Sequence, residues 1–64
     1  MKNNLKILRD EMNLSQDAFG SELNVSRQTI NSIENGKFDP SLTLAIKLTR
    51  FFEVSLDEIF IYKD

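Results

Sequence analysis

Residues 16–35 read QDAFGSELNVSRQTINSIEN, and this stretch decides the fold. Apolar side chains recur at spacings of three or four in each half of it, which predicts two short helices, residues 16–23 and 27–35. Ser15 and Ser26 stand directly before these segments, where an N-cap belongs. We therefore expect two consecutive helices with only a short turn between them.

Two helices joined so closely cannot pack side by side. They cross steeply, as in a helix-turn-helix, whose second helix can lie in a DNA major groove. Gly20 falls where the helices should come closest, so a side chain larger than methyl would push them apart. Asn24 falls at the turn position that requires a left-handed backbone, which asparagine tolerates well. The expected core of this unit is Phe19, Gly20, Leu23, Val25, Ile30 and Ile33.

Helices are also predicted on both sides of this unit. Leu5, Leu8 and Met12 recur at helical spacing and predict a first helix over residues 4–13. Its N-cap is Asn3 or Asn4, and Asn13 is suited to end it with a left-handed backbone. Another helix opens at residues 40–41, Pro-Ser, and runs to about residue 52 with a wide apolar face.

The last ten residues continue this pattern. Residues 55–58 read Ser-Leu-Asp-Glu, a capping box that predicts a short helix over residues 56–60. Residues 59–62, Ile-Phe-Ile-Tyr, either finish that helix or form a short strand. We hypothesise that residues 1–4 and 61–63 pair as a small antiparallel ribbon. The fold class expected is therefore all-α, a five-helix domain over residues 1–64.

Composition excludes several classes of protein. The 64 residues include neither cysteine nor histidine, which removes disulfides and the usual nitrogen-and-sulfur zinc sites. We expect no metal, no cofactor and no small-molecule ligand. No apolar run approaches the roughly 20 residues of a membrane span, and the first residues lack the features of a signal peptide. A cytoplasmic location is expected.

The charge is uneven along the chain. The net charge is −2, which alone argues against a nucleic-acid partner. Residues 27–50 nevertheless hold four basic and two acidic residues, whereas residues 51–64 hold one basic and four acidic. A basic middle and an acidic end suit a protein with one side facing an anion.

The whole pattern resembles a known family. Residues 16–35, followed by Glu-Asn-Gly-Lys at 34–37 and Pro-Ser-Leu at 40–42, are similar to the Cro/Xre-type helix-turn-helix family of phage and bacterial repressors. The resemblance runs from Leu5 to Phe60. It extends to small stand-alone dimeric repressors such as the cytolysin-operon repressor, which share the Arg-Gln-Thr-Ile-Asn start of the recognition helix. Asn24 replaces the usual Gly, and Phe-Gly at 19–20 replaces Leu-Ala; both changes are compatible with the fold.

The resemblance implies roles that the side-chain chemistry supports. Arg27 can bond bidentately to guanine and Gln28 to adenine, and each such pair gives about 1–3 kcal/mol of discrimination. The implied base readers are Arg27, Gln28, Asn31 and Ser32. The implied phosphate contacts are Gln16, Thr29, Asn35 and Lys37.

Each of these residues also has a plain structural interpretation. The four readers could be solvated helix surface, and Gln16 could simply complete the first turn of its helix. Thr29 could bond back to a backbone carbonyl, Asn35 could be only a C-cap, and Lys37 only a loop charge. Glu34 is acidic beside the proposed interface, so we interpret it as structural and paired with a basic residue such as Arg9.

The size of the chain favours a homodimer, because a lone domain this small buries little surface. The apolar residues Leu44, Phe51, Ile59 and Ile61 are candidates for the dimer surface, although such residues are more often core. The leading hypothesis is a dimeric regulator, a repressor, that binds double-stranded DNA at an inverted repeat. The alternative is a protein-interaction module, such as an antitoxin or adaptor, that uses residues 51–64. Nothing in the sequence suggests an enzyme.

Overall fold

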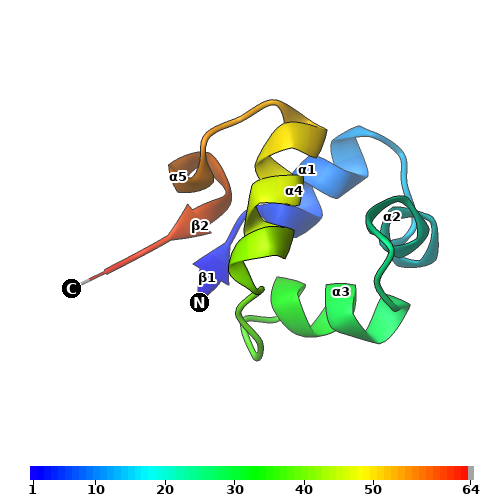
Figure 1. Ribbon diagram of the computed structural model, residues 1–64, viewed down its shortest axis with the longest axis horizontal. Helices are drawn as coiled ribbons and strands as arrows, with labels where there is room; N and C mark the ends of the chain where they lie inside the picture. Colours follow the sequence, from blue (N-terminus) through cyan, green and yellow to red (C-terminus); the bar gives the residue numbers. More distant parts are fainter. Residues whose placement is uncertain (64) are drawn as a thin grey trace.

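A computed structural model describes residues 1–63, which form five helices and a two-stranded antiparallel ribbon (Figure 1). This confirms the predicted fold class and the presence of a terminal ribbon, although the C-terminal strand is Phe60–Ile61 instead of the predicted residues 61–63. In chain order the elements are β1 (Lys2–Asn3), α1 (Leu5–Glu11), α2 (Gln16–Leu23), α3 (Arg27–Glu34), α4 (Leu42–Phe52), α5 (Leu56–Ile59) and β2 (Phe60–Ile61).

The ribbon closes the two ends of the chain on each other. Lys2 pairs with Ile61 and Asn3 with Phe60, and the amide of Asn4 donates to the carbonyl of Ile59 at 2.8 Å. This pairing ends α5 at Ile59 rather than at residue 60, because Phe60 turns to extended backbone to join the ribbon. Residues 59–62 therefore contribute to both a helix end and a strand.

The helix starts follow local chemistry, with one correction. The hydroxyls of Ser15, Ser26 and Ser41 accept from the amide three residues on, at 3.0, 3.1 and 3.2 Å, as N-caps should. The predicted capping box before α5 is wrong, because the Ser55 hydroxyl makes no cap bond. The Glu58 amide instead donates to the backbone carbonyl of Ser55 at 3.1 Å.

The first helix is shorter than predicted. It ends at Glu11 instead of residue 13, and Asn13 then takes the expected left-handed backbone at φ 57°. At its start, the Asn3 side chain accepts from the Leu5 amide at 3.1 Å, while Asn4 makes no side-chain cap bond. The chain thus enters α1 directly from the ribbon.

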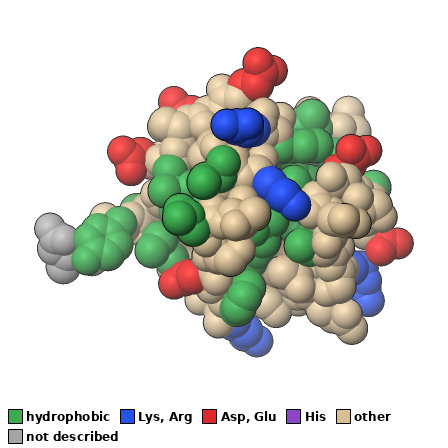
Figure 2. Space-filling model, in the orientation of Figure 1, with side chains coloured by type: hydrophobic (Ala, Val, Ile, Leu, Met, Phe, Trp, Pro, Cys, Tyr) green, Lys and Arg blue, Asp and Glu red, His purple; other side chains and the backbone are tan. Residues whose placement is uncertain are grey.

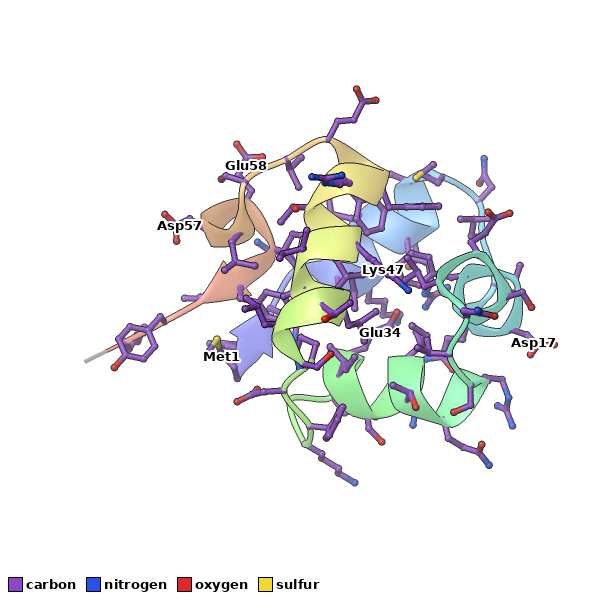
Figure 3. The ribbon with its side chains drawn as sticks, viewed as in Figure 1. Met1, Asp17, Glu34, Lys47, Asp57 and Glu58 are labelled. Atoms are coloured by element: carbon purple, nitrogen blue, oxygen red, sulfur yellow. The ribbon has the colours of Figure 1, made fainter. Side chains whose placement is uncertain are left out.

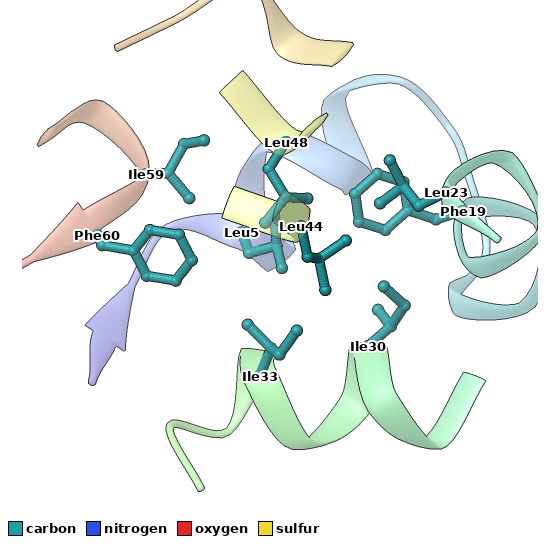
Figure 4. Packing of buried hydrophobic residues seen from close by; sticks show 9 residues of the cluster. All are labelled: Leu5, Phe19, Leu23, Ile30, Ile33, Leu44, Leu48, Ile59 and Phe60. Carbon is teal, nitrogen blue, oxygen red and sulfur yellow. The ribbon is translucent and has the colours of Figure 1, made fainter. Parts of the chain in front are cut away.

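The core lies where the five helices meet (Figure 4). Figure 4 shows side chains from α2, α3 and α4 converging on its centre, with Leu5 beside Leu44 and with Ile59 and Phe60 closing one side. On α2, Phe19 packs against Phe51 and Phe52 of α4, with ring centroids 5.4 Å apart in both pairs. The buried cluster comprises Leu5, Phe19, Leu23, Ile30, Ile33, Leu44, Leu48, Ile59 and Phe60.

The turn between α2 and α3 depends on Gly20. Asn24 ends α2 with left-handed backbone, φ 65°, and the Val25 amide donates to the Gly20 carbonyl at 2.9 Å. A Cβ on Gly20 would lie 2.6 Å from the backbone oxygen of Val25, closer than such atoms approach in proteins. Even a methyl group would therefore require the turn to move, a tighter limit than the sequence indicated.

This contact predicts a large difference between neighbouring positions. Gly20→Val should lower the free energy of unfolding by about 2 kcal/mol or more, because its side chain must displace backbone. Ser21→Val, at the exposed next position of the same helix, should change it by less than about 0.5 kcal/mol. Urea denaturation followed by circular dichroism measures both; equal losses would contradict the close approach.

Within residues 1–63, none of the helices is long and apolar enough to cross a membrane.

Candidate nucleic-acid interface

Helix α3 divides its residues between the core and the surface. Ile30 and Ile33 are fully buried, whereas Arg27, Gln28 and Asn31 are exposed. In Figure 1, α3 runs along one edge of the molecule with no other helix beyond it. Its outer side therefore presents the expected base readers together, with Ser32 half-buried at one margin.

The start of α3 is fixed by a local hydrogen-bond pair. The Ser26 hydroxyl accepts from the Thr29 amide at 3.1 Å and shares a bond with the Thr29 hydroxyl at 3.0 Å. Thr29 is half-buried, and its hydroxyl is already partnered within the helix. The expected phosphate contact of Thr29 therefore competes with this cap.

The C-terminal end of α3 is a tight turn. The Asn35 backbone amide donates to the backbone carbonyl of Asn31 at 3.0 Å, and Asn35 is the C-cap of α3. Gly36 follows with φ 73°. The Lys37 amide donates to the Ser32 carbonyl at 2.9 Å, so its backbone is held although the residue is exposed. Asn35 and Lys37 both remain accessible beside the outer side of α3.

A buried ion pair lies directly behind the readers. Nε and Nη2 of Arg9 on α1 donate to the two carboxylate oxygens of Glu34 on α3, at 2.6 and 3.2 Å. The side chains are only 8% and 4% exposed, and Figure 3 shows Glu34 directed from α3 into the molecule. Arg9 also donates to the Leu14 carbonyl at 2.7 Å. The predicted structural role of Glu34 and its pairing with Arg9 are confirmed.

This contact changes the chemistry of both groups. The hydrogen bond to Glu34 raises the pKa of Arg9 above its ordinary value, although burial acts in the opposite direction. The guanidinium therefore stays charged, and the negative charge of Glu34 is neutralised before it reaches the outer side of α3. An acidic residue on α3 is in this way compatible with the expected role of this helix in DNA binding.

Gln16 is engaged differently from what the sequence suggested. Its side-chain nitrogen donates to Glu34 at 3.0 Å and to the Asn31 side-chain oxygen at 3.1 Å. Both N–H groups are thus used inside the protein. A phosphate contact at this position would have to use the backbone amides of the first turn of α2.

The structure brings in residues that sequence reasoning missed. Phe38, half-exposed in the loop after α3, lines a shallow surface hollow with Gln28, Thr29 and Ser32. Lys47 of α4 lines a neighbouring hollow that also includes Thr29 and Phe38. The only sign of Phe38 in the sequence is that an aromatic residue stands in a polar loop. Nothing in the sequence points to Lys47, because its position beside this surface depends on how α4 packs.

The acidic residues of α5 lie away from α3. Asp57 and Glu58 project from α5, at the opposite end of the molecule from the start of α3 (Figure 3). In Figure 2, acidic side chains occur along the upper, left and right margins of the view. The acidic residues of α5 are therefore separated in space from the start of α3.

The four candidates for a dimer surface have different environments. Leu44 and Ile59 are buried in the core, with 7% and 0% of their surface exposed. Phe51 is half-buried against Phe19 and Phe52. Only Ile61 remains exposed.

Other proteins share this sequence pattern. The profile of the Helix-turn-helix family matches residues 5–59. An uncharacterized HTH-type transcriptional regulator of Methanocaldococcus jannaschii is 55% identical over all of this chain and 97% of its own length. The HTH-type transcriptional regulator YgzD of Bacillus subtilis is 40% identical over 94% of this chain and 91% of its own. Control protein C.MunI of a Mycoplasma species is 39% identical over 91% of this chain and 80% of its own length.

The buried ion pair predicts a strong effect on stability. Glu34→Ala should lower the free energy of unfolding by about 3–5 kcal/mol, because it leaves the Arg9 charge buried without a partner. The double change Arg9→Met with Glu34→Leu should recover most of this loss, since it removes both charges. Asn35→Ala, an exposed neighbour, serves as the control. Thermal and urea unfolding measure the series; a loss below about 1 kcal/mol for Glu34→Ala would contradict the buried pair.

Proposed function

The chain belongs to the helix-turn-helix family of transcriptional regulators, and we propose that it binds double-stranded DNA sequence-specifically by placing α3 in a major groove. In this arrangement Arg27 and Gln28 read base edges, and Asn31 and Ser32 lie one turn further along the groove. The observation that carries the proposal is the row of exposed polar side chains on α3, backed by Ile30 and Ile33 in a rigid core.

The contacts to the DNA backbone flank this row. Lys37 is exposed at the C-terminal end of α3, and its held backbone gives the side chain a fixed origin. Asn35 lies beside it, and the first turn of α2 lies alongside the C-terminal half of α3, where Gln16 bonds to Asn31 and Glu34. Phe38 adds an apolar surface next to Gln28, suited to a thymine methyl group or a sugar.

We further propose that the protein acts as a homodimer. Exposed apolar side chains gather on α4, α5 and the ribbon end, on a face distinct from the outer side of α3 (Figure 2). The protomer measures 33 × 23 × 20 Å, so two copies joined there could present their α3 helices one DNA turn apart, about 34 Å. The residues of this apolar face are Leu42, Ile46, Leu56, Ile61 and Tyr62.

A dimer of this kind suits an inverted-repeat operator. Occupancy of such a site across a promoter excludes polymerase without any further activity of the protein. Repression is therefore the mode of regulation that we propose. The DNA binding on which this repression depends is tested by an electrophoretic mobility shift with the DNA upstream of the protein's own gene. The binding should weaken steeply as the salt concentration rises. Absence of a salt-sensitive shift on any upstream fragment would contradict the proposed function.

Arg27 and Lys37 should differ in their effect on binding. Arg27→Ala should cost about 1–3 kcal/mol and relax the preference at one base pair, because it removes a groove contact. Lys37→Ala should weaken binding to all sequences evenly and reduce the salt slope by about one. Competition with single-base operator variants at several salt concentrations separates the two. Identical behaviour of both variants would show that the division into base and phosphate contacts is wrong.

The apolar face predicts how the dimer can be disrupted. Leu56→Asp should shift the protein to monomers and weaken operator binding by tenfold or more, because two half-sites no longer bind together (about 1.4 kcal/mol per tenfold). Ile7→Asp changes an isoleucine on α1 that is 59% exposed and should leave the assembly intact. Sedimentation equilibrium reports the assembly state. Equal effects of the two changes would place the dimer surface elsewhere.

A further inference from the structure

The Arg9–Glu34 pair continues outward as a chain of hydrogen bonds. Glu34 accepts from Gln16 at 3.0 Å, and the same Gln16 nitrogen donates to the Asn31 side-chain oxygen at 3.1 Å. Asn31 is exposed on the outer side of α3, among the proposed readers. This series of hydrogen bonds therefore runs from a buried guanidinium on α1 to a side chain on the proposed DNA-binding side of α3.

Glu34, at the buried end of this series, determines which group donates and which accepts in every following hydrogen bond. A carboxylate has no proton to donate, so Glu34 can only accept, and Gln16 must turn its NH₂ group toward it. The second N–H of that nitrogen then points to Asn31, which can meet it only with its oxygen. An amide side chain has nearly the same shape when turned by 180°, so these partners alone decide its orientation.

We propose that this relay makes Asn31 a hydrogen-bond donor toward the DNA and thereby sets base preference at one position of the site. With its oxygen held by Gln16, Asn31 presents its NH₂ group to the groove. The bidentate contact of asparagine with adenine needs the oxygen as well, to accept from N6. The relay thus disfavours adenine and favours an edge that only accepts: N7 and O6 of guanine, or O4 of thymine.

The inference rests on the proposed DNA binding and also alters one part of it. Gln16 has no N–H left for a phosphate oxygen, and the atom that it still offers is an acceptor. Gln16 is therefore a positioning residue that acts through Asn31. The buried ion pair holds this end of the relay in place, since both of its side chains are almost inaccessible.

A first experiment needs no DNA. In the free protein, the side-chain NH₂ protons of Gln16 should exchange with water roughly tenfold more slowly than those of exposed Gln28. The reason is that both NH₂ protons of Gln16 are hydrogen-bonded. Nuclear magnetic resonance on ¹⁵N-labelled protein measures both residues in one sample. Equal exchange for Gln16 and Gln28 would overturn the relay, whatever the DNA result.

A second experiment tests the effect on reading. Sites are selected from a pool of randomised duplex DNA with the wild-type protein, Gln16→Met and Gln28→Met. Gln16→Met keeps the length of the side chain but frees Asn31 to turn. The preference for guanine or thymine at one base pair, expected to be roughly five- to tenfold in the wild type, should fall below about threefold or pass to adenine. Gln28→Met, the matched control, should change a different base pair.

The outcomes are distinguishable. If the wild-type protein enriches no sequence although Gln16 is protected, the proposed DNA reading fails, and the role of the relay in reading fails with it. If the wild type enriches a site and Gln16→Met enriches the same site with the same preference at every position, DNA binding stands and the relay does not control it. A change confined to one base pair, different from that altered by Gln28→Met, supports the inference.

Discussion

The contact between Arg9 and Glu34 is the constraint on which the arrangement of the first three helices depends. One guanidinium bonds to both oxygens of a carboxylate on α3 and to the carbonyl of Leu14 in the turn after α1. It therefore fixes α1, that turn and α3 at a single point. Burying two charges is costly unless they pair closely, so alternative packings that separate them are strongly disfavoured. We infer that this pair provides specificity of packing, with apolar burial providing most of the stability.

The same contact explains how α3 can carry an acidic residue and still be the helix that we propose faces DNA. Glu34 turns inward and is neutralised, which leaves Arg27 as the only charged side chain on the outer side of α3. Asp57 and Glu58 on α5 lie at the other end of the molecule. A net charge of −2 is therefore compatible with the proposed binding of DNA, because an approaching anion responds most to the charges near the surface that it contacts.

Much of this could be predicted from the sequence, because the determining features are local. Serine caps, Asn24 and the spacing of Ile30 and Ile33 gave α2 and α3 with their turn, and the helix count was confirmed. Long-range features were less accessible. Whether Leu44 faces a partner or the core depends on where α2 lies, and the bonds of Gln16 depend on three helices at once. The capping box failed because the ribbon, a contact between chain ends, shapes the last turn.

The most direct test of the account is to record which residues respond when DNA is added. Backbone amide resonances of ¹⁵N-labelled protein should be followed during titration with a duplex that the protein retards in a mobility shift. The account predicts that the largest shift changes cluster at the start of α3 and α2 and at Lys37, with little change in α5. Changes concentrated on α5 and the ribbon, with α3 unaffected, would contradict it.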